Sequence, residues 1–251
     1  MGRWPQRQTE DLSAWVFGRA SVPDLERRRG TGARRRSARG LLDPYKGGFH
    51  VLDNAAIAAM RARFIAAQPQ ADDLLISYTL ACEVIIHFFG YDWFRTNVGS
   101  AQGPPDPYFV GDDRDIESQY VHQHRVIEVG RLLFEVRAVP NFLAVAERLK
   151  SKPADDVVLE LRVARILSRA GHEVSFHQPS QVSGMKSYDF DVGFNKSSIA
   201  VEVKAKVDEI AYSRASLHST LKKARQQLPP RGPGVTVVKI RDPTQRSLDR
   251  S

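Results

Sequence analysis

Two short segments in the C-terminal half of the chain carry acidic and basic side chains at a spacing that suits phosphodiester chemistry. Glu202 and Lys204 are two residues apart, and Asp189 lies thirteen residues before Glu202. A divalent cation held by hard oxygen ligands activates water and relieves negative charge on a phosphorane-like transition state. Because Mg²⁺ often takes only one or two carboxylates from a protein, Asp189 and Glu202 would suffice to hold it. Lys204 could then orient the attacking water or neutralise developing charge.

Alternating apolar residues predict that both segments are strands. In residues 199–205 the valines and the isoleucine share one face, which leaves Glu202 and Lys204 on the other, about 7 Å apart. The same alternation in residues 188–194 turns Asp189 and Asp191 away from the apolar side chains. If the two strands pair as a hairpin, an Asp, a Glu and a Lys converge on one sheet face.

The surrounding pattern predicts an α/β domain with the element order αβββαβ and a mixed sheet. An amphipathic helix that ends at Gly171 fits a glycine C-cap, and Pro229-Pro230 ends the later helix. The elements expected are a helix (154–170), three strands (172–177, 188–194 and 199–205), a helix (216–228) and a fourth strand (235–240).

Three regions are expected along the chain: a basic arm (1–48), a mainly helical region (49–150) and the α/β domain (151–251). Within the helical region, Asp53 and either Asp72 or Asp73 are expected to start two helices. A proline-rich loop is expected over residues 97–113. A third helix is expected from residues 112–115 to about 138, and a short fourth helix from Pro140 to Lys150.

Basic residues concentrate in the arm. Residues 1–50 hold eleven Lys/Arg against five Asp/Glu, a net charge of +6 out of the chain's +8. Seven arginines lie between Arg27 and Arg39, among them Arg34, Arg35 and Arg36. With so few apolar residues the arm is expected to be disordered. It is either a nucleic-acid contact or a solvated leader.

The α/β region resembles the PD-(D/E)XK, or restriction-endonuclease-like, superfamily, which includes archaeal Holliday-junction resolvases and many restriction enzymes. The resemblance covers about 90 of the 251 residues and rests on Tyr-Asp-Phe-Asp-Val at 188–192, Val-Glu-Val-Lys at 201–204 and the αβββαβ order. It extends to a glutamate, Glu160, three helical turns before Gly171.

This resemblance implies a role for each matching residue. Asp189 and Glu202 would be metal ligands, with Asp191 as the alternative to Asp189, and Lys204 would be the catalytic lysine. Glu160 would be an accessory metal ligand, although it could instead be a solvated partner of nearby arginines. The residues in the place where relatives contact phosphate are Lys222, Lys223, Arg225 and Gln226.

Together these features predict a Mg²⁺-dependent (or Mn²⁺-dependent) nuclease that hydrolyses phosphodiester bonds in DNA. The alternatives are a non-catalytic nucleic-acid-binding module with this fold and a structural or interaction protein. The sequence leaves open whether the protein forms a homodimer. The absence of a long apolar run and of a secretion signal predicts a cytoplasmic protein without a membrane partner. Its single cysteine, Cys82, excludes an internal disulfide.

Overall fold

The computed structural model of the protein describes residues 52–98, 106–112, 114–151, 153–177, 188–195, 197–205 and 214–239. The chain divides between Leu80 and Ala81 into two compact units, and each is considered by itself. This division does not coincide with the boundary predicted at residues 151–153, which stays a prediction. The basic arm, with Arg34, Arg35 and Arg36, lies outside the described residues.

The first unit contains α2 (Asn54–Ala67) and the beginning of α3 (Asp73–Phe89). Asp53 caps α2 by accepting a 2.7 Å hydrogen bond from the backbone N–H of Ala56. Asp72 accepts the equivalent 2.9 Å bond from Leu75 at the start of α3. Both predicted helix starts are confirmed. At each one, a short acidic side chain accepts a hydrogen bond from a backbone N–H group that has no partner within the helix.

The second unit begins with the rest of α3 and continues through a series of helices that precede the sheet in the chain. They are α4 (Tyr91–Asn97), the 3₁₀ turn η3 (Pro107–Phe109), α5 (Ile116–Val136) and α6 (Phe142–Arg148). Gly90, at φ 84°, ends α3 and allows the turn into α4. The loop predicted over residues 97–113 is therefore wrong in part, since η3 lies within it. The third and fourth predicted helices are confirmed as α5 and α6.

The αβββαβ order is confirmed as a mixed α/β arrangement with a four-stranded sheet. The elements are α7 (Ala154–Arg169), β1 (Val174–Phe176), β2 (Phe190–Phe194), β3 (Ser197–Ala205), α8 (Arg214–Gln227) and β4 (Gly234–Lys239). The sheet order is β1-β2-β3-β4. The first three strands pair antiparallel, whereas β4 pairs parallel to β3 after the crossover through α8.

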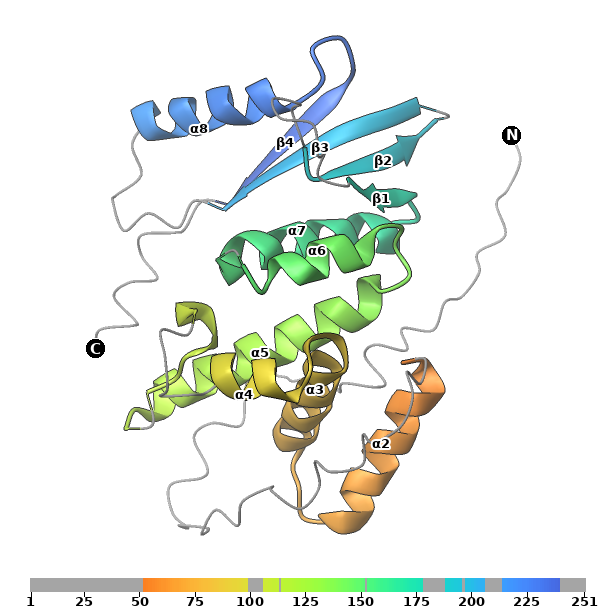
Figure 1. The fold of residues 1–251 in the computed structure, drawn as a ribbon, viewed down its shortest axis with the longest axis vertical. Helices are drawn as coiled ribbons and strands as arrows, with labels where there is room; N and C mark the ends of the chain where they lie inside the picture. Colours follow the sequence, from red (N-terminus) through yellow and green to blue (C-terminus); the bar gives the residue numbers. More distant parts are fainter. Residues whose placement is uncertain are drawn as a thin grey trace. The chain divides into compact units, whose positions relative to one another are not determined.

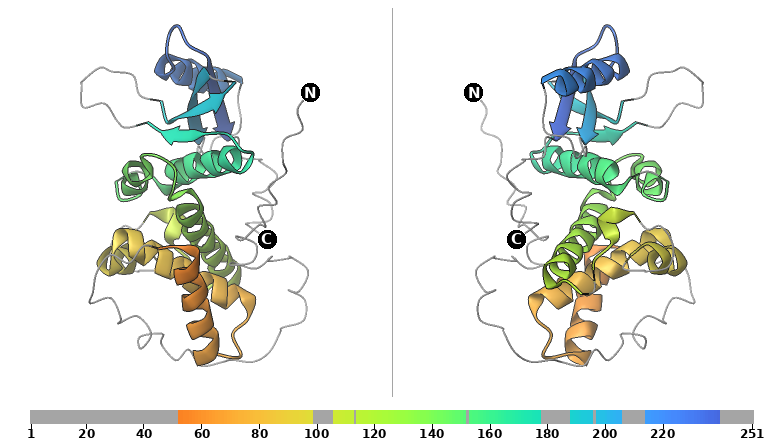
Figure 2. Two further views of the ribbon diagram at one scale, coloured as in Figure 1. Left: turned by 90° about the vertical axis from the view of Figure 1, so that its right-hand side faces the viewer. Right: turned by 90° about the vertical axis from the view of Figure 1, so that its left-hand side faces the viewer.

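Helices cover both faces of this sheet. Figure 1 shows α7 against one face and α8 against the other, and the side views in Figure 2 agree. β3 is the strand that both helices contact, and its residues 200–203 are all buried. A strand covered on both faces has no solvated side, so a charged residue in it is buried whichever way it points.

Two contacts fix the ends of α7, the helix that carries Glu160. Asp106 accepts hydrogen bonds from Tyr108 N–H (2.8 Å) and from Ala154 N–H (2.7 Å), which ties the segment before η3 to the start of α7. Gly171 follows the helix at φ 87°, as predicted for a glycine C-cap. These two features fix where the helix begins and ends.

None of the described helices, taken singly, has both the length and the apolar character needed to cross a bilayer. Helices α3 and α4 reach that length and apolar content only together, and the chain bends by 119° between them.

Candidate active site

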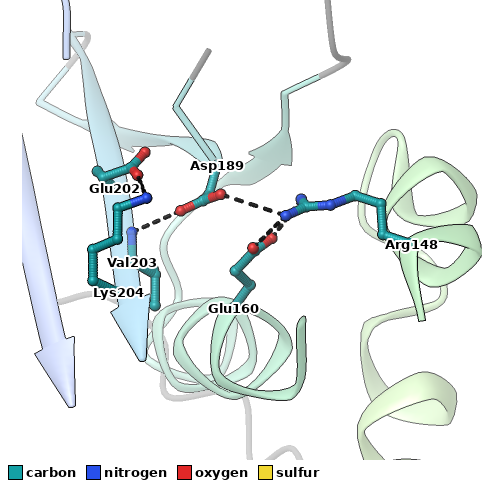
Figure 3. A network of polar contacts seen from close by, with 6 residues as sticks. All are labelled: Arg148, Glu160, Asp189, Glu202, Val203 and Lys204. Atoms are coloured by element: carbon teal, nitrogen blue, oxygen red, sulfur yellow. Dashed lines mark hydrogen bonds and ion pairs between the residues drawn. The ribbon is translucent and has the colours of Figure 1, made fainter. Parts of the chain in front are cut away.

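Asp189 lies immediately before Phe190, the first residue of β2. Its backbone N–H donates to Val201 of β3 (3.1 Å), and its carbonyl accepts from His177 just after β1 (2.9 Å). Its carboxylate then accepts a 2.7 Å hydrogen bond from the backbone N–H of Val203. The carboxylate therefore continues the β2–β3 ladder by one further bond, and the sheet holds it in place beside Glu202 (Figure 3).

Glu202 is buried, which differs from the exposed polar face that alternation alone predicts. Only 1% of its surface is exposed, because β3 is covered on both faces. Its Oε1 forms an ion pair with Lys204 Nζ, yet neither carboxylate oxygen has a hydrogen-bond partner among the described residues. The Lys204 side chain is 32% exposed, so it leads from this buried carboxylate toward solvent.

The burial changes the proton affinity of the carboxylates. Desolvation first, and the neighbouring Asp189 carboxylate second, raise the pKa of Glu202 to about 7 against the lowering effect of Lys204. Burial and Asp189 also raise the pKa of Glu160, while Arg148 opposes that shift. Both pKa shifts come first from burial and second from the Asp189 carboxylate nearby.

Glu160 points from α7 toward the same place, but its partner was not anticipated. Arg148, the last residue of α6, donates from Nη1 to Glu160 Oε2 (2.7 Å) and from Nη2 to Oε1 (2.5 Å). Its Nη2 also lies 3.9 Å from Asp189 Oδ1. Figure 3 shows the guanidinium lying across Glu160 and Asp189. No short spacing in the sequence relates Arg148 to Asp189, and only the packing of α6 beside α7 brings the two residues together.

The alternative in which Glu160 is a solvated partner of neighbouring arginines is wrong. Glu160 is only 3% exposed. Arg162 pairs with Glu128 of α5 at 2.6 Å, and Arg165 and Arg169 approach Glu135 of α5. Those arginines join α7 to α5, while Glu160 faces the sheet.

Asp191, the alternative to Asp189, lies in a different environment. Its carboxylate accepts hydrogen bonds from Ser198 Oγ (2.8 Å) and from the Tyr188 hydroxyl (3.1 and 3.2 Å). The geometry thus brings Asp189, rather than Asp191, together with Glu202, Lys204 and Glu160. The alternation rule placed both aspartates on one face, but Asp189 precedes the first residue of β2 and is not bound by the strand's alternation.

A divalent metal fits the chemistry of this donor set. Two carboxylates with hard oxygens lie side by side, and one buried oxygen of Glu202, Oε2, has no hydrogen-bond partner among the described residues, while Oε1 contacts Lys204. The residues that would hold the ion are Asp189 and Glu202. Within the described part of the chain, no group of three or more His, Cys, Asp or Glu side chains is arranged to hold a metal.

The predicted phosphate-contacting residues lie together on α8. Lys222, Lys223, Arg225 and Gln226 are all exposed, and Arg225 also donates to the carbonyl of Pro229 (3.2 Å). α8 covers the sheet face opposite α7 (Figure 1). The side chains are thus accessible, and their contact with nucleic acid stays a prediction.

Comparison with protein-family models, with curated protein sequences and with solved structures found no match.

Proposed function

We propose that this protein is a Mg²⁺-dependent nuclease-like enzyme that hydrolyses DNA phosphodiester bonds, with a restriction-endonuclease-like α/β domain and Asp189, Glu202 and Lys204 at its active site. The observation that supports it most is the buried Glu202 carboxylate, 1% exposed, beside Asp189 and paired with Lys204. A buried charge without adequate hydrogen bonding is costly. Such an arrangement is more typical of a functional site than of a structural one.

Each residue has a distinct role in this proposal. The Val203 N–H fixes the orientation of the Asp189 carboxylate, so that this ligand is positioned before substrate arrives. Glu202 supplies a second carboxylate from the rigid centre of the sheet. When bound there, Mg²⁺ would supply Lewis-acid polarisation of the phosphate and lower the pKa of water.

Lys204 provides the cation beside these carboxylates. Its ammonium contacts Glu202 and reaches partial exposure, where a phosphate of a bound strand would arrive. A fixed positive charge at that position stabilises negative charge that develops on the phosphoryl oxygens. Lys204 would act on the transition state more than on the ground state, which is how a residue raises the rate of the chemical step.

A second candidate is a nucleic-acid-binding module without catalysis. The ion pairs Lys204–Glu202 and Arg148–Glu160 favour it, because they neutralise carboxylates that a metal would otherwise use. The exposed basic residues of α8 would then account for binding. The two candidates differ in whether bound DNA is cleaved.

The test is a cleavage assay with the full chain on linear duplex, branched and single-stranded DNA, with Mg²⁺ or with EDTA. We expect Mg²⁺-dependent cleavage of at least one substrate by the parent protein and none by Glu202→Gln. Glu147→Gln, which removes an exposed carboxylate paired with Lys150, is the matched control and should cleave at the parent rate. Binding of DNA without cleavage would support the second candidate, and a fully active Glu202→Gln protein would contradict the first.

A further inference from the structure

We propose that Arg148 is an internal counter-ion that competes with a divalent cation for the carboxylates of the site and so sets its metal affinity. This inference rests on the proposed function, because it concerns the metal that Asp189 and Glu202 would hold. It adds a residue on α6 to a site otherwise built from α7, β2 and β3. Arg148 acts on the metal only through the carboxylates and has no proposed contact with substrate.

The geometry of the guanidinium is the first argument. Arg148 contacts both oxygens of Glu160, at 2.5 and 2.7 Å, and it is only 18% exposed. A planar guanidinium that binds a carboxylate through two parallel hydrogen bonds is the strongest and most directional form of ion pair. While this pair persists, both Glu160 oxygens are already engaged by hydrogen-bond donors.

The second argument is the balance of charge. Three carboxylates meet at this end of the sheet, from Glu160, Asp189 and Glu202, and two cations face them, from Arg148 and Lys204. One Arg148 nitrogen lies 3.9 Å from Asp189, close enough to offset part of that carboxylate's charge as well. A metal ion entering between Asp189 and Glu202 would therefore meet a repulsive positive charge a few ångströms away.

The third argument is the cost of separating the pair. Removing the partner of a buried charge costs on the order of 3 to 5 kcal/mol, so the guanidinium leaves Glu160 only if another cation replaces it. Arg148 thus has two effects on a metal. It occupies the Glu160 carboxylate, so that Glu160 cannot bind the ion, and its positive charge repels an ion bound at Asp189. Both effects weaken binding, and both disappear when the positive charge is removed.

The experiment measures Mn²⁺ binding to the DNA-free protein by electron paramagnetic resonance of the free ion. We expect Arg148→Met to lower the Mn²⁺ dissociation constant by about tenfold or more, since a unit charge acts strongly at a few ångströms in a partly buried site. Arg148→Lys, which keeps the charge, should stay within about threefold of the parent because the Coulomb effect is retained. Arg162→Met is the matched control, because it removes an arginine of α7 whose partner is Glu128. It should change the Mn²⁺ dissociation constant by less than about threefold, since salt screens a charge that does not contact the site.

A second pair of variants covers the case in which Arg148→Met fails to fold because Glu160 loses its partner. Glu160→Gln leaves Arg148 beside Asp189, and the double variant Arg148→Met/Glu160→Gln removes the guanidinium without leaving a buried unpaired carboxylate at position 160. The double variant should bind Mn²⁺ more tightly than Glu160→Gln alone. Circular dichroism establishes that each variant is folded.

The outcomes separate this inference from the proposed function. Equal Mn²⁺ affinity in the parent and in Arg148→Met would overturn the competition while leaving the metal site intact. Weaker binding in Arg148→Met would also overturn it, because Arg148 would then position the ligands rather than compete for them. Absence of Mn²⁺ binding in every variant would overturn the proposed metal site itself and this inference with it.

Discussion

The carboxylate of Asp189 accepts a 2.7 Å hydrogen bond from the backbone N–H of Val203, and this bond extends the pairing of β2 and β3 to the residue before the start of β2. Asp189 therefore has a structural role as well as a proposed chemical one. Substitutions that retain an acceptor and substitutions that remove it should have different consequences.

The first prediction separates these two roles. Asp189→Asn can still accept from Val203, so its stability should stay close to the parent's, whereas Mn²⁺ binding and cleavage should be lost with the charge. Asp189→Ala should also destabilise the fold by about 1 to 3 kcal/mol, because it leaves a buried N–H without a partner. Urea unfolding measures the stability of each variant. The control is Asp191→Asn, which should remain active, and an inactive Asp191→Asn beside an active Asp189→Asn would reverse the ligand assignment.

The second prediction concerns the pH dependence of stability in the metal-free protein. Glu202 has a pKa of about 7 in the native state against 4.5 for an ordinary glutamate, so the native state binds more protons between these values. The free energy of unfolding should therefore fall as the pH rises from about 5 to about 7, by up to about 3 kcal/mol from this residue. The raised pKa of Glu160 adds to the fall in the same direction.

Glu202→Gln should reduce this fall, because the amide does not titrate. The measurement is urea unfolding at pH 5, 6 and 7 in the presence of EDTA, with Glu147→Gln as the exposed control. A parent protein whose stability rises over this interval, or a Glu202→Gln protein with the parent's pH dependence, would contradict the account.

The third prediction concerns Asp106, which joins η3 to the start of α7 through Tyr108 and Ala154. Asp106→Ala should lower the free energy of unfolding by about 1 to 2 kcal/mol, the usual cost of a lost helix cap. Asp112→Ala is the matched control, because its carboxylate caps only a local turn at Arg114. If the two variants are equally stable in urea, Asp106 does not anchor the helix that carries Glu160.

The fourth prediction concerns the exposed lysines of α8. If Lys222 and Lys223 each contact a phosphate, changing both to Gln should flatten the plot of log K against log salt concentration by up to about 2, at roughly 0.9 per contact. Lys239→Gln, on the neighbouring strand β4, is the control for a general loss of charge. DNA binding measured from low to high salt gives the slope, and an unchanged slope in the double variant would remove α8 from the binding surface.

The fifth prediction concerns Lys204. Lys204→Met keeps the length of the side chain and removes the charge, so Mn²⁺ binding should be retained. Single-turnover cleavage should fall by about a hundredfold or more, on the order of 3 kcal/mol, because the lost charge acts on the transition state. Lys239→Met is the control. A Lys204→Met protein that cleaves DNA at the parent rate would exclude Lys204 from the mechanism.

Local patterns predicted much of the fold because local chemistry determines it. Asp53 and Gly171 mark helix ends whose backbone groups need a nearby partner or a left-handed conformation, and both signals are present within a few residues. The β2–β3 hairpin followed from alternation. The short helix α4 after Gly90 was not predicted, because its seven residues are too few to display helical periodicity.

The site was only partly predictable, because some of its features depend on the packing of helices that are distant in the sequence. Asp189, Glu202 and Lys204 come from two adjacent strands, so their convergence follows from sequence spacing. The burial of Glu202 depends on the helices that cover both faces of β3, and strand alternation carries no information about that cover. Arg148 is brought to Asp189 by the packing of α6 against α7, which no motif in the sequence reports.

An anomalous difference map from crystals of the protein soaked in Mn²⁺ would show directly whether Asp189 and Glu202 hold a metal ion. We expect a peak between the carboxylates of Asp189 and Glu202, with the Lys204 ammonium beside it, and its loss in crystals of Glu202→Gln. A map without a peak there, in which Glu202 still pairs only with Lys204 and Arg148 still lies across Glu160 and Asp189, would contradict the proposed metal site.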